Sequence, residues 1–419
     1  MLISNNKIFF CLLSILPLSI VVGPTVSLIN ILLIVSLYFF FFFKFEHYEF
    51  LFENNTIRLL FIIYIYLIFN SFISVDFESG LNRNLGFIRL IFLFIAINYF
   101  FYISKTNLDI LNIWSVFILI FVCDVYFEKF SGANILGWGG DFGERIVSFF
   151  KDEPIAGAYI NGFTLLICGY LLLIFKNNKK LYIPLSLLFL AFLFSIIITG
   201  ERSNSLKALF GIILFLSCLN FIKLKSKVLL FLFLIGSFIL VIYNSTYLKN
   251  RYVDQLYSDA FLNKDYNFFE KNIYIKLYKS GFEVFKNSPL LGVGNKNYRV
   301  ETCSEKAKKF NYYCITHPHQ IYFEFLSEHG LIGTTILLSI FFYLIFKNLK
   351  TILLSQNYIQ LGAFTYLLST FLPLLPSGSF FSDFNITLFF INLSLMYGVN
   401  KKTNIFFKKI SVIKPIKGR

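Results

Sequence analysis

The sequence predicts an all-α membrane protein: a transmembrane bundle of about twelve helices (11–13) with a large, partly helical loop between the ninth and tenth. The first observation is composition, with 57% hydrophobic and 15% charged residues, whereas soluble domains carry roughly 25% charged residues. The second is a mean hydropathy of +0.70. The third is a series of apolar runs of roughly 17–25 residues, the length that crosses a bilayer as a helix.

The expected spans follow these apolar runs in order. The first run continues past Gly23 and Pro24 into a second one, which indicates a hairpin of two spans rather than a cleavable signal peptide. The spans are expected at about 8–22, 25–43, 57–75, 85–103, 108–127, 155–175, 181–199, 204–222, 227–246, 329–346, 358–376 and 380–398.

Lysines and arginines in the short loops indicate the orientation, because they concentrate on the cytoplasmic side. With the N-terminus inside, the inside segments hold 19 of these residues and the short outside loops hold 5. Both termini are therefore expected in the cytoplasm. The predicted divisions are spans 1–9 (1–246), a periplasmic loop (247–328), spans 10–12 (329–400) and a basic cytoplasmic tail (401–419).

The net charge of +15 fits this topology and gives no support to nucleic acid as a partner, because the basic residues lie between apolar runs and in the tail. The inside loops are short, which leaves no room for a cytosolic catalytic domain. The chain also lacks an Asp-x-Asp pair. These features argue against use of a cytosolic nucleotide-activated donor.

Two of the six cysteines, Cys303 and Cys314, fall in the large outer loop, and the others fall within spans. An oxidising compartment would favour a disulfide between them, and the alternative is two free thiols. The same loop contains an amphipathic stretch over 272–286 that predicts a helix at the membrane surface. Gly292 and Gly294 follow it and permit close approach of the backbone to a ligand or another helix.

Three of the four histidines, His317, His319 and His329, lie within thirteen residues. Pro318 disfavours helix before it and favours a helix start after it. Gln320, together with Glu324 and Glu328, would share one face of that helix. An imidazole suits general-base chemistry near neutral pH. The alternatives are a metal site, which the intervening proline and the shortage of further ligands disfavour, and histidines that merely cap a helix.

Among the eight arginines, Arg145, Arg202, Arg251 and Arg299 are expected on the same outer side as the histidines. Guanidinium groups at the membrane boundary suit bidentate binding of phosphate or pyrophosphate. The alternative is that they extend to lipid head groups. Lys207, one turn after Arg202, would add to such a basic site, whereas a structural role is expected for Arg89.

Four motifs together resemble the O-antigen ligase and O-antigen polymerase family. Residues 319–323 (His-Gln-Ile-Tyr-Phe) and 328–333 (Glu-His-Gly-Leu-Ile-Gly, with Gly330 and Gly333) are similar to its His motif and Glu-x-Gly-x-x-Gly ending. Residues 289–294 match its Pro-x-x-Gly-x-Gly element, and 199–203 resemble its Thr-Gly-x-Arg. Residues 145–159 resemble a further stretch found in part of the family. The resemblance covers roughly 140–345.

The sequence departs from the family at two points. Phe323 stands where leucine is usual. Tyr274 lies near the position of the family's arginine in the amphipathic loop helix, so Arg251 or Arg299 would have to replace it.

The resemblance implies an inverting, metal-independent membrane glycosyltransferase with no cofactor, acting at the periplasmic face of a bacterial inner membrane. Its donor would be a glycan on undecaprenyl pyrophosphate. A ligase passes the glycan to the lipid A core, a polymerase passes it to another lipid-linked repeat, and related members glycosylate proteins. His319 would be the general base, Arg202 with Arg145 or Arg299 would hold the pyrophosphate, and the apolar helices would bind the polyprenyl tail.

Supporting roles are expected for the neighbours of these groups, namely His317, Gln320, Glu328, Glu201 and Glu153. Two other classes stay open. A transporter or flippase would place acidic residues in mid-membrane, and the candidates, Asp124 and Asp383, lie near span ends. A scaffold would need no cluster of histidine and arginine on the outer side.

Overall fold

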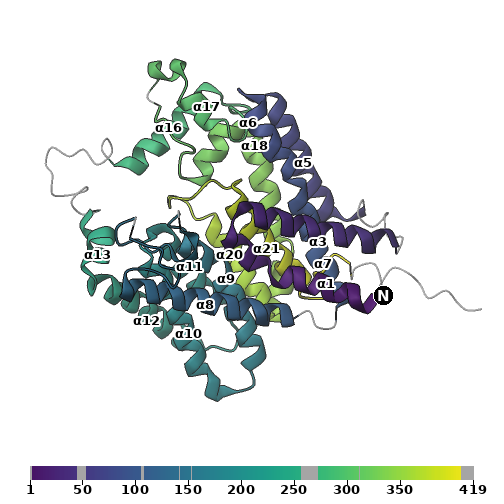
Figure 1. Ribbon diagram of the computed structural model, residues 1–419, viewed down its shortest axis with the longest axis vertical. Coiled ribbons are helices and arrows are strands. Elements are labelled where there is room, and N and C mark those ends of the chain that lie inside the picture. The colour runs from purple at the N-terminus through teal and green to yellow at the C-terminus, as the bar shows by residue number, and fades with distance from the viewer. Residues whose placement is uncertain are drawn as a thin grey trace, which may run out of the picture.

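The regular elements of the chain are helical throughout the described residues, which confirms the predicted all-α class. The computed structural model describes residues 2–44, 53–104, 108–140, 142–151, 153–255, 272–310 and 312–406. Part of the predicted loop (256–271), Lys105 and the tail from residue 407 onward lie outside them. Each of the twelve predicted spans coincides with a helix or a pair of helices (Figure 1).

The helices before the large loop are α1 (Leu2–Ser14), α2 (Leu16–Val22), α3 (Pro24–Lys44), α5 (Asn55–Phe72), α6 (Phe77–Gly86), α7 (Ile88–Ile103), α8 (Asp109–Ser131), α9 (Ala156–Phe175), α10 (Tyr182–Ile198), α11 (Arg202–Cys218), α12 (Leu224–Tyr243) and α13 (Thr246–Lys249). Those that follow are α16 (Ile273–Asn287), α17 (Tyr298–Thr302), α18 (Ile321–Phe346), α19 (Leu349–Ser355), α20 (Tyr358–Thr370) and α21 (Asp383–Gly398). The short turns are η1 (Ser148–Phe150), η2 (Lys179–Leu181), η3 (Asn250–Asp254) and η5 (Glu305–Lys309).

Seven helices in the described part of the chain are long and apolar enough to cross a membrane. The count of twelve spans stays a prediction. In α12, only 17% of the 18-residue apolar window is buried inside the protein, and Leu232, Phe233 and Leu240 are more than half exposed. Such a surface is stable where lipid is the solvent. The protein is therefore a multi-pass membrane protein.

Several predicted ends of the spans are wrong, and they differ from the structure where a proline or a glycine breaks or bends a helix. The first span is divided at Ile15, because Pro17 lies in the first turn of α2. Helix α20 ends at Thr370 rather than near 376, ahead of Pro373 and Pro376. Helix α18 begins at Ile321, inside the predicted loop, and kinks at Gly330.

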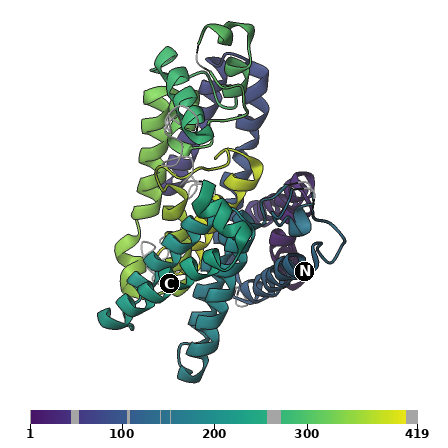
Figure 2. The same cartoon turned by 90° about the vertical axis from the view of Figure 1, so that its left-hand side faces the viewer.

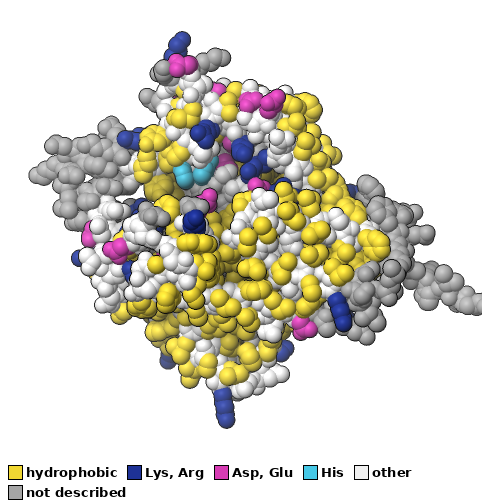
Figure 3. All heavy atoms as spheres, in the orientation of Figure 1, with side chains coloured by type: hydrophobic (Ala, Val, Ile, Leu, Met, Phe, Trp, Pro, Cys, Tyr) yellow, Lys and Arg dark blue, Asp and Glu magenta, His cyan; other side chains and the backbone are white. Residues whose placement is uncertain are grey.

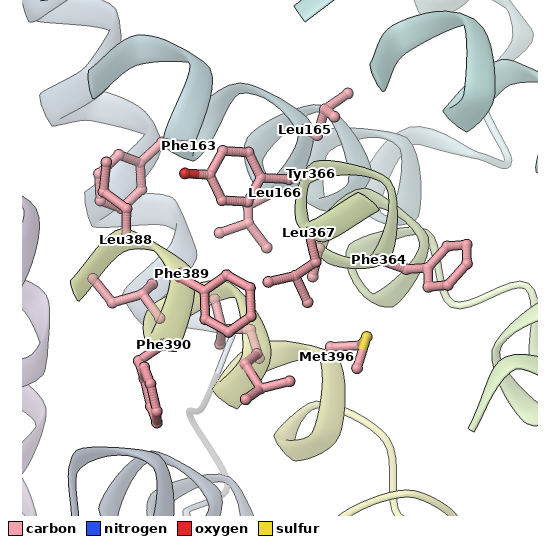
Figure 4. Packing of buried hydrophobic residues seen from close by; sticks show 14 of the residues in the cluster. Phe163, Leu165, Leu166, Phe364, Tyr366, Leu367, Leu388, Phe389, Phe390 and Met396 are labelled. Carbon is pink, nitrogen blue, oxygen red and sulfur yellow. The ribbon is translucent and has the colours of Figure 1, made fainter. Parts of the chain in front are cut away.

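The centre of the bundle is the contact of α9 with α20 and α21 (Figure 4). Leu166 of α9 points toward Leu367 and Phe389 there, and Phe163 lies beside Leu388. Glycine brings the backbones together, because a Cβ added to Gly362 would lie 2.0 Å from the carbonyl oxygen of Leu165. Small residues of this kind replace the hydrophobic effect as the basis of helix packing in lipid.

Helix α16 forms over the predicted amphipathic range. Asn272 caps it by accepting hydrogen bonds from the next turn. Its buried residues, Leu277, Ser280, Gly281 and Val284, lie on one face, and the helix packs on α18. Figures 1 and 2 show α16, α17, α18, α5 and α6 grouped above the rest of the bundle. This upper group is one side of the candidate site.

Candidate functional site

A large cavity of about 1460 Å³ opens between the upper group and the helices below it. Figure 3 shows the histidines in this hollow, with Lys and Arg side chains on both of its sides. The walls come from the first turns of α9, α11 and α16, the turn at 295–296, the histidine segment, and residues 374–385 between α20 and α21. Segments that are far apart in the sequence therefore share one cavity.

His317 and His319 both line the cavity, and their ring centroids are 4.0 Å apart. The backbone of His319 has a φ of +53°, in the left-handed region that non-glycine residues rarely adopt. Strain of this kind persists only where the surroundings hold it, and it concentrates at functional sites. The next residue, Gln320, is the N-cap of α18 and accepts hydrogen bonds from the backbone N–H groups of Tyr322 and Phe323.

Ser377 holds this histidine segment from the opposite wall. Its backbone N–H donates to the carbonyl oxygen of His319 (2.8 Å). The carbonyl oxygen of Ser377 accepts from Nε2 of His317 (3.3 Å). Because a carbonyl oxygen can only accept, the proton of His317 lies on Nε2, and Nδ1 accepts from the hydroxyl of Thr316 (3.0 Å). The tautomer of His317 is thereby fixed.

Burial sets the charge of both imidazoles. It lowers the pKa of His317 to about 4, aided by the neighbouring His319. Burial also lowers the pKa of His319, and a backbone hydrogen bond with Ser377 offsets part of the change. Both rings are therefore neutral at pH 7 and able to accept a proton.

Arg145, Arg202 and Arg251 line the lower side of the cavity. Arg202 donates to the carbonyl oxygen of Arg251 (3.0 Å), and Nε of Arg251 donates to the carbonyl oxygen of Gly200 (2.5 Å). Arg145 donates to the carbonyl oxygen of Pro154 (3.0 Å), while its Nε is buried without a hydrogen-bond partner. The three guanidinium groups are anchored by neutral carbonyls, so their positive charge remains for an anion.

Glu201 lies beside these arginines and caps the start of α9. Its carboxyl oxygens accept from the backbone N–H groups of Gly157 (2.6 Å) and Ala158 (3.2 Å) and from the side chain of Asn204 (2.7 Å). Burial raises the pKa of Glu201 to about 7, against these hydrogen bonds and the charge of Arg145. It therefore joins α9 to α11 at the cavity wall.

Two cations on the upper side were missed by the sequence reasoning as site residues. Arg83, at the end of α6, and Lys296, in the turn after α16, both line the cavity. A signal existed for Arg83, because the loop charges predict that it lies on the same side of the membrane as the histidines. The signal for Lys296 was weaker: it lies two residues after the Pro-x-x-Gly-x-Gly element at 289–294.

The remaining candidates are placed differently. Glu153 and Lys207 line the cavity, whereas Arg299, Gln320 and Glu328 do not. Arg299 is exposed on α17. Glu328 is buried in α18, where its carboxyl group accepts a hydrogen bond from the backbone N–H of Tyr298 (3.3 Å). Glu328 thus holds the turn before α17. Arg89 pairs with Asp383, as its expected structural role requires.

The four glycines of the motifs lie where backbones meet. A Cβ on Gly292 would lie 2.4 Å from the carbonyl carbon of Glu328, and one on Gly330 would lie 2.4 Å from that of Leu290. The same atom on Gly294 or Gly333 would strike Ser74 or Tyr66. The two glycine motifs therefore lock the 288–294 turn against the kink of α18. Beyond this turn, Cys303 and Cys314 form a disulfide.

Apolar helices suited to a bilayer, surrounding a cavity that holds histidines and cations, define a multi-pass membrane protein with a polar site enclosed by the bundle. A search of curated proteins finds no match to the chain. Residues 187–338 match the family model described as O-antigen ligase. Residues 187–338 therefore form a domain of the O-antigen ligase family, and this domain associates the chain with membrane glycosyltransferases of that type. Arg202, Arg251, His317 and His319 fall within the matched range.

Proposed function

We propose that the protein transfers a glycan from undecaprenyl pyrophosphate to an acceptor hydroxyl, with inversion and without a metal ion. In the ligase form of the proposal the acceptor is the lipid A core. The observation that carries it is that one cavity contains two neutral imidazoles and, on its lower side, three guanidinium groups. A displacement of pyrophosphate by a sugar hydroxyl needs a proton acceptor and a stabiliser of negative charge.

His319 is the general base of this proposal. The acceptor oxygen attacks the anomeric carbon of the donor, the bond from that carbon to the phosphate oxygen breaks, and His319 takes the hydroxyl proton. One displacement inverts the anomeric configuration. Its lowered pKa keeps His319 in the basic form at neutral pH. Its strained backbone, fixed through Ser377, holds the ring in place.

Arg202, with Arg145 and Arg251, receives the departing pyrophosphate. Their positive charges lie on one side of the cavity, and the guanidinium geometry matches phosphate oxygens. Glu201 and Glu153 orient this group, and Glu201 does so while it caps α9. The polyprenyl tail lies against apolar lining residues such as Ile155, Leu206 and Leu388. In this proposal the cavity faces the periplasm and both termini face the cytoplasm of a bacterial inner membrane.

The direct test is cell-free transfer by purified protein in lipid, from a lipid-linked donor to a lipid A core acceptor, without ATP or an ion gradient. His319→Ala is expected to lower the transfer rate by about 10²–10⁴-fold, the usual contribution of a general base. Near-normal transfer by a folded His319→Ala protein would remove the proposed base. Product that forms only from lipid-linked repeats would identify a polymerase instead.

The arginines have a matched pair of variants. Arg202→Ala is expected to lower the rate by about 10²–10³-fold, as loss of one donor to a developing anion does. Arg299→Ala removes the same charge from the exposed surface of α17, outside the cavity. It should transfer at the wild-type rate. Equal losses in both variants would show that Arg202 acts through general charge or folding rather than through the pyrophosphate.

A further inference from the structure

The turn at 294–297 presents a lysine in a strained conformation. Lys296 has a φ of +63°, a region in which Gly and Asn are common and Lys is unusual. Its side chain is exposed and lines the cavity. A flexible surface turn would relax this strain. The strain therefore indicates a turn that its neighbours hold in one form.

The neighbours are buried polar groups on three helices. The backbone N–H of Gly294 donates to the carbonyl oxygen of Glu328 in α18 (2.9 Å). The backbone N–H of Asn295 donates to the side chain of Asn70 in α5 (2.7 Å). Asn295 also donates to Asn84 of α6 through its side chain. The next residue is thereby fixed toward the cavity.

A second anchor follows Lys296 directly. Asn297 is fully buried and accepts a hydrogen bond from the backbone N–H of Asp76 (2.7 Å). The carboxyl group of Glu328 accepts from the backbone N–H groups of Lys296 and Tyr298. Lys296 is thus the one cavity-lining cation of the described residues that stands between two buried, hydrogen-bonded asparagines.

Arg83 stands near Lys296 on the same upper wall. The two influence one another electrostatically, and Arg83 lines the cavity with 22% of its side chain exposed. Arg83 lies 3.6 Å from Asp383, but Arg89 also pairs with that carboxylate. The carboxyl groups of Glu324 and Glu328 also act on these cations, but both are buried in α18 and neither lines the cavity. The part of this wall that faces the cavity therefore presents two cations, Arg83 and Lys296, and one carboxylate, Asp383.

This pair is separate from the arginines assigned to the donor. Arg83 and Lys296 belong to α6 and to the turn before α17, whereas Arg202 belongs to α11. Figure 1 shows α6 and α17 on the upper side of the molecule and α11 on the lower side, and Figure 3 shows basic side chains on both sides of the histidines. One pyrophosphate bound by the lower arginines leaves the excess positive charge of the upper wall available for a second anion.

We propose that Arg83 and Lys296 form a second anion subsite, which binds a phosphate group of the acceptor. The inference rests on the proposed transferase function, because it needs an acceptor to enter the cavity opposite the donor. Two kinds of acceptor have a phosphate group that could bind at this subsite: a saccharide with a phosphate monoester, and a second lipid-linked glycan with its pyrophosphate. A charge-assisted contact at this subsite positions the acceptor hydroxyl toward the histidines.

The test uses Lys296→Asn, because asparagine tolerates a positive φ and removes the charge. Lys151→Asn is the matched control: Lys151 is exposed, has a φ of +41° and lies outside the cavity lining. Binding is measured on purified full-length protein in nanodiscs, which does not depend on transfer. The probes are a phosphorylated core oligosaccharide, the same oligosaccharide after phosphatase treatment, and an undecaprenyl-pyrophosphate-linked repeat.

For a phosphorylated saccharide acceptor, Lys296→Asn should weaken binding of the phosphorylated oligosaccharide about tenfold or more. Binding of the phosphatase-treated oligosaccharide and of the lipid-linked repeat should be unchanged, and Lys296→Arg should restore the affinity. For a lipid-linked acceptor, the wild type should bind two lipid-linked molecules and Lys296→Asn should bind one.

Unchanged binding of every probe, or an equal effect of Lys151→Asn, would overturn the subsite. So would weakened binding of the first lipid-linked molecule, because that result would place Lys296 with the donor. Failure of the proposed function is a different result: transfer would survive His319→Ala, whatever the binding of the phosphorylated probes.

Discussion

Glu324 is the buried connection between α18 and the wall that holds the histidines. Its carboxyl oxygens accept from the hydroxyl of Ser379 (2.6 Å) and from the backbone N–H of Phe380 (3.0 and 3.1 Å). Ser377, two residues earlier, makes the backbone contacts to His317 and His319. We predict that Glu324→Ala releases the segment 377–380 and weakens the placement of both imidazoles.

The expected size of the effect follows from the loss of the acceptor for two hydrogen-bond donors, the hydroxyl of Ser379 and the backbone N–H of Phe380. Glu324 is 1% exposed, so water does not replace the carboxyl group freely. Each buried donor left unpaired costs about 1–3 kcal/mol, which gives about 2–6 kcal/mol for the pair. At about 1.4 kcal/mol per factor of ten, even the lower value raises the open population of this segment by about 30-fold.

Amide hydrogen exchange of peptides that cover 377–381 measures this opening in the purified protein. Glu324→Gln is expected to lie close to the wild type, because its Oε1 can still accept from Ser379 and Phe380. Glu283→Ala, which breaks a surface ion pair with Lys286 on α16, is the control and should leave the segment protected. Unchanged exchange in Glu324→Ala would refute the reasoning, as would equal acceleration in the Glu283→Ala control.

Three further predictions concern the two histidines and the kink of α18. Because burial lowers the pKa of His319, the acid limb of kcat/KM should have its midpoint below pH 6.5, and a midpoint at or above 6.5 would contradict the assignment. The unfolded chain takes up a proton on His317 near pH 6.5, whereas the folded chain does so near pH 4, so the free energy of unfolding should fall as the pH drops between these values. Gly330→Ala should cost more than about 3 kcal/mol in chemical denaturation, because its φ of +63° and ψ of −169° exclude other residues and the new Cβ would lie 2.4 Å from Leu290. Gly132→Ala, at φ +83° with no atom within 4 Å, should cost about 1–3 kcal/mol, and equal costs for the two would show that the close contact is unimportant.

The helices of this protein follow from its sequence because their signals are local. A run of apolar residues forms a helix in lipid whatever lies beside it, since the backbone must satisfy its own hydrogen bonds. Apolar residues at helical spacing over 272–286, with lysines on the opposite face, likewise predicted α16, and Asn272 caps it. Hydropathy alone did not predict where the helices end or bend. Pro17, Pro373 and Gly330 shift or bend the helix ends that the apolar runs suggested.

The candidate site was predictable in part, for the residues that motifs mark. His317, His319, Arg145, Arg202 and Arg251 were all singled out from the sequence, and the structure brings them to one cavity. The loop charges also predicted a common side of the membrane for them. Their common cavity was not predictable, because a topology gives the face of the bilayer and leaves lateral position open.

The sequence by itself determined which segments form helices, and it predicted which chemical groups lie on one face of the membrane. Tertiary structure alone decided which of those groups meet. Arg299, which its position in the chain favoured, does not line the cavity. Arg83 and Lys296, which are far apart in the sequence, both line it. The tertiary structure also supplied Ser377 and Glu324 as the groups that fix the histidines. The physical reason is that helix formation depends on near neighbours along the chain, whereas a cavity depends on how helices distant in sequence pack around it.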